Sequence, residues 1–335
     1  MVEGRGRMER RAHLRQLEPV TRAYMERRLS ENSKPLPQMS IVAARDYMQQ
    51  SQNTPFANTS VHAEEREIAG VRSRVVRPAN AVDALPVILY LHGGGWALGA
   101  PETHARLVCS LAERAAAAVV VPEYALAPEH RYPHALEQCV SIVRALKKGE
   151  LRGLNPARIA VAGDSAGGNL AAALALRCAE QEIASFTLQA LICPVLEATP
   201  STASYREFAS GFNLDADTMQ WFWAQYVEES RRYEITASPL RASRELLARV
   251  APAWIVTAGC DVLRDEGERY GEQLIEAGNA ATVLRCAATV HNFPVIDDLQ
   301  ESGPAIAATA AMGEALRVAL HSKTGARTVA QMERT

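Results

Sequence analysis

One stretch near the middle of the chain constrains the fold more than any other. It reads Ile159-Ala-Val-Ala-Gly-Asp-Ser-Ala-Gly-Gly-Asn-Leu170 and continues as an alanine- and leucine-rich segment to about Glu180. Its first part is a short apolar run typical of a buried strand, and its second part is typical of a buried helix. Ser165 therefore stands at a sharp turn from strand to helix, with glycines two positions away on either side.

The glycines at this turn have a physical role. A serine held clear of a sheet at such a turn adopts strained backbone geometry, and we expect any side chain two residues away to collide with the flanking strand or helix. The free N–H groups at the helix N-terminus also favour negative charge beside the serine. The pattern Gly-x-Ser-x-Gly occurs by chance in many chains. Whether Ser165 is a nucleophile therefore depends on the motifs that precede and follow it.

Length and charge exclude several classes of protein. The 335 residues allow one large α/β domain or two ordinary ones, and the net charge is -2, from 36 basic and 38 acidic residues. This balance predicts no nucleic-acid partner, and no apolar stretch is long enough to span a bilayer. We find no secretory signal, and six scattered cysteines without a metal-ligand pattern indicate reduced, buried thiols in a cytoplasmic protein.

Strand and helix patterns alternate through most of the chain. An opening hairpin turns at Gly70, between segments 61–68 and 71–76, and a near-continuous apolar strand follows at 86–91. Further buried strands are predicted at 118–122, 159–162, 190–193, 253–258 and 282–286, with helices at 103–116, 133–147, 168–180 and 266–277. This order predicts an α/β fold with a mostly parallel sheet.

Two segments stand outside this alternation. Residues 1–55 contain two helical patterns, at about 8–29 and 39–50, which must pack outside the main domain or over its mouth. Residues 197–240 are too long for an ordinary crossover, and we interpret them as an inserted cap with Asp215 capping a helix. The catalytic domain is then predicted at 56–196 and 241–323, followed by a flexible tail at 324–335.

Hydrolysis through Ser165 requires a base and an acid that orients it. His291 follows the last predicted strand, and Asp261 follows the strand at 253–258, so all three lie where parallel strands end. This order of serine, acid and histidine matches the known template for a serine at such a turn. Asp265 is a rival acid, and either aspartate can instead cap the following helix, while a histidine after a strand is often only a polar loop residue.

A glycine-rich loop follows the apolar strand at 86–91. It reads His92-Gly-Gly-Gly-Trp96, and its glycines let the backbone approach a bound carbonyl and direct N–H groups at it. The alternatives are a flexible loop or a phosphate cradle, but no Gly-Lys-[Ser/Thr] follows, which excludes a P-loop. The N–H of Ala166 is a further donor at the turn itself.

Taken together, these motifs resemble a known family. His92-Gly-Gly-Gly-Trp96, Tyr124-Ala-Leu-Ala-Pro-Glu-His-Arg-Tyr-Pro133, Gly163-Asp-Ser-Ala-Gly-Gly168, Asp261-Val-Leu-Arg-Asp265 and His291-Asn-Phe293 occur in the order found in the hormone-sensitive-lipase-like (family IV) carboxylesterases, in the Gly-Asp-Ser-Ala-Gly branch that includes bacterial acetyl esterases. The departures are Val262 in place of proline, Asn292 in place of glycine or aspartate, and Glu123 in place of aspartate.

The resemblance implies an α/β-hydrolase fold with an eight-stranded sheet and a helical cap, and neither cofactor nor metal. It implies Ser165, Asp261 and His291 as the catalytic triad, and Gly94, Gly95 and Ala166 as oxyanion donors. Asp261 is preferred over Asp265 because it matches the first aspartate of the family's Asp-Pro-Leu-Arg-Asp motif.

The resulting functional prediction is a serine esterase acting on small esters with short acyl chains through an acyl-enzyme. The alternatives are an amide or lactone hydrolase with the same triad, or a non-catalytic ligand-binding receptor on the same fold. The resemblance also suggests a homodimer through the edge of the last strand. Aromatic residues of the cap and the glycine loop either wall the substrate pocket or form the core of the cap; they are Trp96, Trp221, Phe222, Trp223 and Tyr226.

Overall fold

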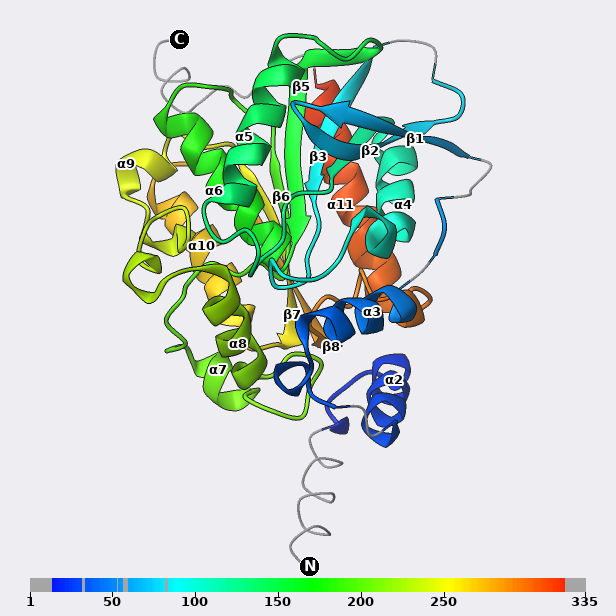
Figure 1. Cartoon of the computed structure of the whole chain (residues 1–335), viewed down its shortest axis with the longest axis vertical. Helices are drawn as coiled ribbons and strands as arrows, with labels where there is room; N and C mark the ends of the chain where they lie inside the picture. The colour runs from blue at the N-terminus through cyan, green and yellow to red at the C-terminus, as the bar shows by residue number, and fades with distance from the viewer. Residues whose placement is uncertain (1–13, 32–33, 53, 57–59, 82–83, 323–335) are drawn as a thin grey trace, which may run out of the picture.

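The computed structural model describes residues 14–31, 34–52, 54–56, 60–81 and 84–322, which form helices around one central sheet (Figure 1). The sheet has eight strands in the order β1-β2-β4-β3-β5-β6-β7-β8. The strands are β1 Val61–Ile68, β2 Val71–Pro78, β3 Leu85–Leu91, β4 Ala118–Pro122, β5 Leu154–Asp164, β6 Gln189–Ile192, β7 Ala253–Cys260 and β8 Ala281–Val290. The predicted fold class, a mostly parallel eight-stranded sheet with flanking helices, is confirmed.

The register of the sheet brings the ends of its central strands to one edge. β2 is antiparallel to both β1 and β4, and the remaining pairs are parallel. Leu91 at the end of β3 pairs with Gly163 of β5, and Asp164 pairs with Ile192 of β6. The loops that follow these strands therefore meet at the same edge, as expected for a site in an open parallel sheet.

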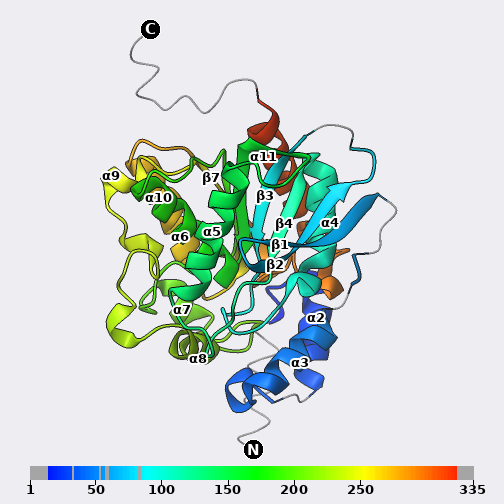
Figure 2. The same cartoon turned by 45° about the horizontal axis from the view of Figure 1, so that its top comes forward.

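Helices cover both faces of the sheet. α4 (Ala105–Ala115) and α11 (Gly303–His321) pack together on one face, while α5 (His134–Lys147), α6 (Ala166–Glu180) and α10 (Arg264–Glu276) lie on the other (Figure 2). Burial on both faces explains why β3 reads as a continuous apolar run, since its residues from Val87 to Leu91 are completely buried.

Four more helices gather at the carboxyl edge of the sheet (Figure 1). They are α2 (Pro19–Ser30), α3 (Ile41–Ser51), α7 (Ala203–Glu207) and α8 (Ala216–Tyr226). The hydroxyl of Tyr24 in α2 donates to Oδ1 of Asn213, 3.2 Å away in the inserted segment. Both segments that depart from the strand–helix alternation thus meet over the edge where the site lies. The remaining helical turns are η1 Leu36–Gln38, η2 Pro101–His104, η3 Glu229–Arg231, η4 Pro239–Arg241, α9 Arg244–Leu247 and η5 Asp297–Leu299.

Several local predictions need correction. α2 begins at Pro19, because the proline occupies the first helical turn and Glu18 caps it; the part of the predicted helix before residue 14 lies outside the described residues. Asp215 occupies the N-cap position of α8, but its carboxylate accepts from the N–H of Gly211 at 3.0 Å and does not cap the helix. α11 was not predicted from the sequence, although Ser302 caps it and a proline follows in its first turn.

Two broader expectations can also be compared with the structure. None of the helices in the described part of the chain is both long and apolar enough to cross a membrane. All six cysteines are free; five are buried, and Cys286 is half-buried. The predicted tail at 324–335 lies outside the described residues.

Candidate active site

Ser165 occupies the sharp turn between β5 and α6. Its φ and ψ angles are 52° and -119°, a conformation that residues other than glycine rarely adopt, and the residue is 6% exposed. A Cβ on Gly163 would lie 2.4 Å from the carbonyl oxygen of Gly167, and a Cβ on Gly167 would lie 2.0 Å from that of Leu91. The glycines are required because the turn packs this closely against itself and against the end of β3.

His291 and Asp261 complete a hydrogen-bonded chain with this serine. Nε2 of His291 lies 2.9 Å from Oγ of Ser165, and Nδ1 lies 2.8 Å from Oδ2 of Asp261. The other carboxylate oxygen of Asp261 accepts the N–H of Leu263 at 3.0 Å. Because the ionised carboxylate only accepts, the imidazole carries its proton on Nδ1 and offers Nε2 to the serine hydroxyl.

The rival acid is engaged elsewhere. Asp265 lies in the first turn of α10, where its carboxylate accepts the N–H of Ser204 at 2.8 Å and the Nε–H of Arg264 at 2.9 Å. The structure thus brings Asp261, and not Asp265, to His291.

The glycine loop after β3 lies beside the hydrogen-bonded Ser165, His291 and Asp261. Gly94 and Gly95 have φ angles of 115° and 60°, so both need glycine, and a Cβ on Gly94 would lie 2.4 Å from the carbonyl oxygen of Leu98. Among the described residues, the N–H groups of Gly94, Gly95 and Ala166 have no protein acceptor. Unpaired donors of this kind, close to a nucleophile, can receive the oxyanion of a tetrahedral intermediate.

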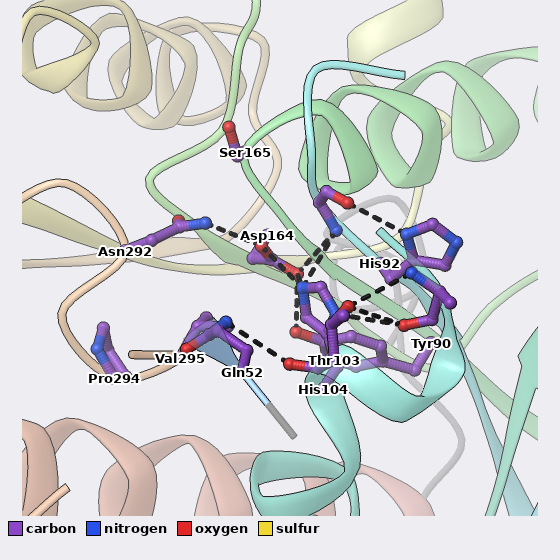
Figure 3. A network of polar contacts seen from close by, with 12 residues as sticks. Gln52, Tyr90, His92, Thr103, His104, Asp164, Ser165, Asn292, Pro294 and Val295 are labelled. Atoms are coloured by element: carbon purple, nitrogen blue, oxygen red, sulfur yellow. Dashed lines mark hydrogen bonds and ion pairs between the residues drawn. The ribbon is translucent and has the colours of Figure 1, made fainter. Parts of the chain in front are cut away.

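Asp164, which directly precedes the serine, is the centre of a buried polar network (Figure 3). Its carboxylate accepts from the hydroxyl of Tyr90 at 2.8 Å, the N–H of Gly93 at 3.0 Å, Nε2 of His104 at 3.3 Å and Nδ2 of Asn292 at 2.7 Å. Burial alone would raise the pKa of Asp164, but the positive charge and hydrogen bond of His104 hold it below its ordinary value. One carboxylate thereby joins the serine turn, the glycine loop and the loop that carries His291.

His92, the first residue of the glycine motif, has a structural position. Its ring stacks on Tyr124 with centroids 4.3 Å apart, and its Nδ1 lies 2.9 Å from the carbonyl oxygen of Gly93. Burial, with the adjacent His104, lowers the pKa of His92 to about 3, so the ring stays neutral. This ring supports the backbone that bends into the glycine loop.

The loop after His291 is held from several sides. Asn213 donates to the carbonyl oxygen of His291 at 3.1 Å, and the guanidinium of Arg106 donates to the carbonyl oxygens of Pro294 and Val295 at 2.8 and 3.0 Å. Gln52, which follows α3, accepts the N–H of Asp297 at 3.0 Å. Segments far apart in sequence therefore position the histidine.

Cys193 is a further neighbour that sequence patterns did not reveal. Its Sγ, a carboxylate oxygen of Asp261 and a ring nitrogen of His291 all lie within 4.8 Å of one another. The residue is buried, with a φ of 43°. Burial, reinforced by the charge of Asp261, raises the pKa of the Cys193 thiol well above its usual range, so this thiol is a donor.

The cap aromatics mostly pack on the glycine loop. Trp96 is buried and stacks on Tyr226 with centroids 4.1 Å apart, and a Cβ on Gly95 would lie 2.0 Å from the ring of Phe222. Trp221 is partly buried against the core. Of the five aromatic candidates, Trp223 lines a cavity, and the other four are not among the residues that line it.

A buried histidine between a serine and an aspartate, next to unpaired backbone donors at the edge of a parallel sheet, is the arrangement of a serine hydrolase. Comparison with known proteins narrows this class. Residues 88–295 match the family model described as the alpha/beta hydrolase fold. The chain belongs to this family, within its hormone-sensitive-lipase-like carboxylesterases, which are carboxylic ester hydrolases.

Individual relatives support this assignment. The chain is 37% identical over 225 residues to the ethyl acetate hydrolase of Pseudomonas putida, covering 66% of this chain and 70% of that protein. It is 35% identical over 262 residues to the carboxylesterase NlhH of Mycobacterium tuberculosis, covering 76% and 82%. The crystal structure of a thermostable esterase from Pseudomonas putida ECU1011 is similar with a TM-score of 0.88 and 37% identity, covering 92% and 99%.

Proposed function

We propose that the protein hydrolyses small carboxylic esters, with Ser165 as the nucleophile. Oγ attacks the acyl carbon while His291 takes its proton on Nε2 and then delivers that proton to the leaving alcohol. Asp261 holds the imidazole in the required tautomer and stabilises its charged form. The N–H groups of Gly94, Gly95 and Ala166 bind the oxyanion, and a water molecule activated by His291 then releases the acid from the acyl-enzyme.

One observation carries this proposal. The serine Oγ, both imidazole nitrogens and the carboxylate of Asp261 are joined by hydrogen bonds of 2.9 and 2.8 Å. This series of hydrogen bonds serves no purpose in a receptor that only binds a ligand, so it favours catalysis over the non-catalytic alternative. The same triad also cleaves amides and lactones, and the relatives named as ester hydrolases favour esters.

The proposed substrates have short acyl chains. Support comes from the aromatic side chains of α8, which pack directly on the glycine loop, and from the modest volume of the neighbouring cavity, about 350 Å³. The relatives named for ethyl acetate and for carboxylic esters agree with this size class.

The test is hydrolysis of p-nitrophenyl esters from acetate to laurate by the parent protein and by Ser165→Ala and His291→Ala. We expect activity on the short chains, and we expect both substitutions to lower kcat by several orders of magnitude. A folded parent that cleaves none of the esters would refute the proposal. If Ser165→Ala kept the kcat of the parent and changed only by a lower KM, the assignment of Ser165 as the nucleophile would be refuted.

We also propose the larger organisation that the sequence suggests. Residues 1–55 and 197–240 form a cap over a catalytic domain at 56–196 and 241–323. A cytoplasmic location is supported by the free thiols. A homodimer through β8 is supported by its position at the edge of the sheet and by the exposure of Val283 and Leu284.

A further inference from the structure

A cavity of about 350 Å³ is lined entirely by residues of the inserted segment, from Ala198 just after β6 to Arg232. Its apolar walls include Ala198, Met219 and Trp223, and its polar groups include Gln220 and Arg232. This volume is at the small end of the range for ligand sites, about 300–1,000 Å³. A cavity with apolar walls and one cationic group fits a small ligand that has an apolar body and an anionic end.

The cavity is built into the surroundings of the triad. Its wall residue Trp223 packs on Trp96 of the glycine loop, with ring centroids 4.7 Å apart. Three residues before Ala198, the N–H of Val195 donates to the carbonyl oxygen of Ser165 at 3.1 Å. Segments that line the cavity therefore contact both the glycine loop, through Trp223, and the serine turn, through the loop after β6.

The backbone beside Arg232 is held firmly. The buried hydroxyl of Ser238 accepts the N–H of Ala198 at 3.0 Å and donates to the carbonyl oxygen of Arg232 at 2.6 Å. One fully buried side chain thus ties together two walls of the cavity. This fixes the position from which the guanidinium reaches the cavity.

Arg232 has no counter-ion in the described part of the chain. No ion pair or side-chain hydrogen bond engages its guanidinium there, and its buried Nε has no acceptor. The acidic residues near it in sequence do not pair with it: Glu228 pairs with Arg131, Glu234 pairs with Arg231, and Glu229 is exposed and forms no ion pair with Arg232.

Acidic side chains just before Ala198 and in the first turn of α10 are also engaged. Glu197, just before Ala198, is bound by Arg241 at 3.0 Å, and Asp265 is bound by Arg264 and Ser204. Glu266 is buried, which raises the pKa of its carboxyl well above the ordinary value. The half-buried positive charge at the cavity is therefore left uncompensated by the residues that the structure describes, a costly arrangement unless a ligand pairs with it.

We infer that this cavity is a subsite for an anionic group of the substrate, with Arg232 as the residue that selects it. The inference rests on the proposed esterase function and narrows its substrates to small esters that also carry a carboxylate. The carboxylate pairs with Arg232 while the ester carbonyl lies at Ser165. The carboxylate of such an ester belongs either to its acyl part or to its alcohol part. The experiment distinguishes these two groups of esters.

The test compares esters that differ by one carboxylate, using titration of released acid at pH 7.5. Methyl butyrate and monomethyl succinate form the acyl-side pair, and phenyl acetate and 4-acetoxybenzoate form the alcohol-side pair. For each pair the measured quantity is kcat/KM of the anionic ester divided by that of the neutral ester.

We expect Arg232→Gln to lower this ratio about tenfold or more for one pair, since a hydrogen bond to a charged group is lost. Arg232→Lys should restore part of it.

The matched control is Arg241→Gln, because Arg241 already pairs with Glu197 and is not part of the cavity lining. Its ratios should equal those of the parent. If Arg232→Gln has the parent's ratio for both pairs, or if the parent accepts only the neutral esters, the subsite is refuted while the esterase function stands. If the folded parent cleaves none of the four esters, the esterase function and the subsite both fail. Thermal denaturation of each variant verifies that it is folded.

Discussion

Asn292 is hydrogen-bonded through its side chain to Asp164, with Nδ2 2.7 Å from Oδ2. Asn292 follows the histidine of the triad, and Asp164 precedes the serine. Ser165 and His291, which exchange a proton in the proposed mechanism, are therefore also linked through their chain neighbours. This link holds the distance between the two loops independently of the bond between Ser165 and His291.

Asn292→Gly tests this link. Asn292 has a φ of 58°, which glycine adopts freely, so the substitution removes the amide and leaves the backbone unstrained. We expect kcat to fall about tenfold and KM to change less, because the loss acts on the position of His291 and not on substrate binding. Asn292→Asp, which places a second carboxylate against Asp164, should lose more. Steady-state kinetics on a p-nitrophenyl ester would contradict the role if Asn292→Gly were as active as the parent.

Asp164→Asn tests the centre of the network. The carboxylate accepts from four donors, whereas an amide must turn its NH₂ towards some of them. We expect the free energy of unfolding in urea to fall by about 2 kcal/mol or more, as when buried donors lose a charged acceptor. Asp265→Asn is the matched control, since its carboxylate is partly exposed, and it should lose less. Equal losses in the two variants would argue against a special role for Asp164.

The main features of the fold followed from local patterns. The apolar run of β3 and the glycines around Ser165 predict a buried parallel strand and a tight turn, because each pattern has one main physical solution. The start of α2 and the length of β8 were less predictable. They depend on a proline-led cap at residue 19 and on pairing with β7 beyond the predicted strand.

The supporting residues of the site depended on contacts distant in sequence. Cys193 lies beside Asp261 only because β6 and β7 are neighbours in the sheet, and His104 reaches Asp164 from a turn that precedes it by 60 residues. The spacing of these residues along the chain predicts neither contact. The position of Asn292 did carry a signal, since asparagine is favoured where φ is positive, and its donor role emerged from the structure.

Cys193 is predicted to position the acid of the triad. Its Sγ lies within 4.8 Å of the carboxylate of Asp261, which accepts from His291. We expect Cys193→Ala to lower kcat/KM about three- to tenfold through loss of one weak donor, and Cys193→Ser to retain most of the activity because a hydroxyl also donates. Rescue by serine separates hydrogen bonding from simple packing. If both variants lose the same activity, the thiol only fills space; Cys286→Ala, at a half-buried site away from the triad, is the control.

Glu266 should make the parent protein less stable as the pH rises. The residue is 1% exposed, and one carboxylate oxygen accepts the N–H groups of Leu196 and Glu197 at 3.2 and 2.8 Å. Burial, opposed only in part by these two bonds, raises the pKa of Glu266 well above its ordinary value of 4.5. The folded state therefore keeps a proton that the unfolded state releases above about pH 4.5. Between that pH and the folded pKa, this group lowers the free energy of unfolding by about 1.4 kcal/mol per pH unit.

Glu266→Gln removes this titration, while its amide oxygen still accepts both N–H groups. We expect the variant to match the parent near pH 4 and to become progressively more stable than the parent as the pH rises towards 7. Urea denaturation at pH 4, 5.5 and 7 measures the difference, with the exposed Glu272→Gln as a control whose difference from the parent should stay small and constant. A constant difference for Glu266→Gln would mean that Glu266 titrates alike in the folded and unfolded states.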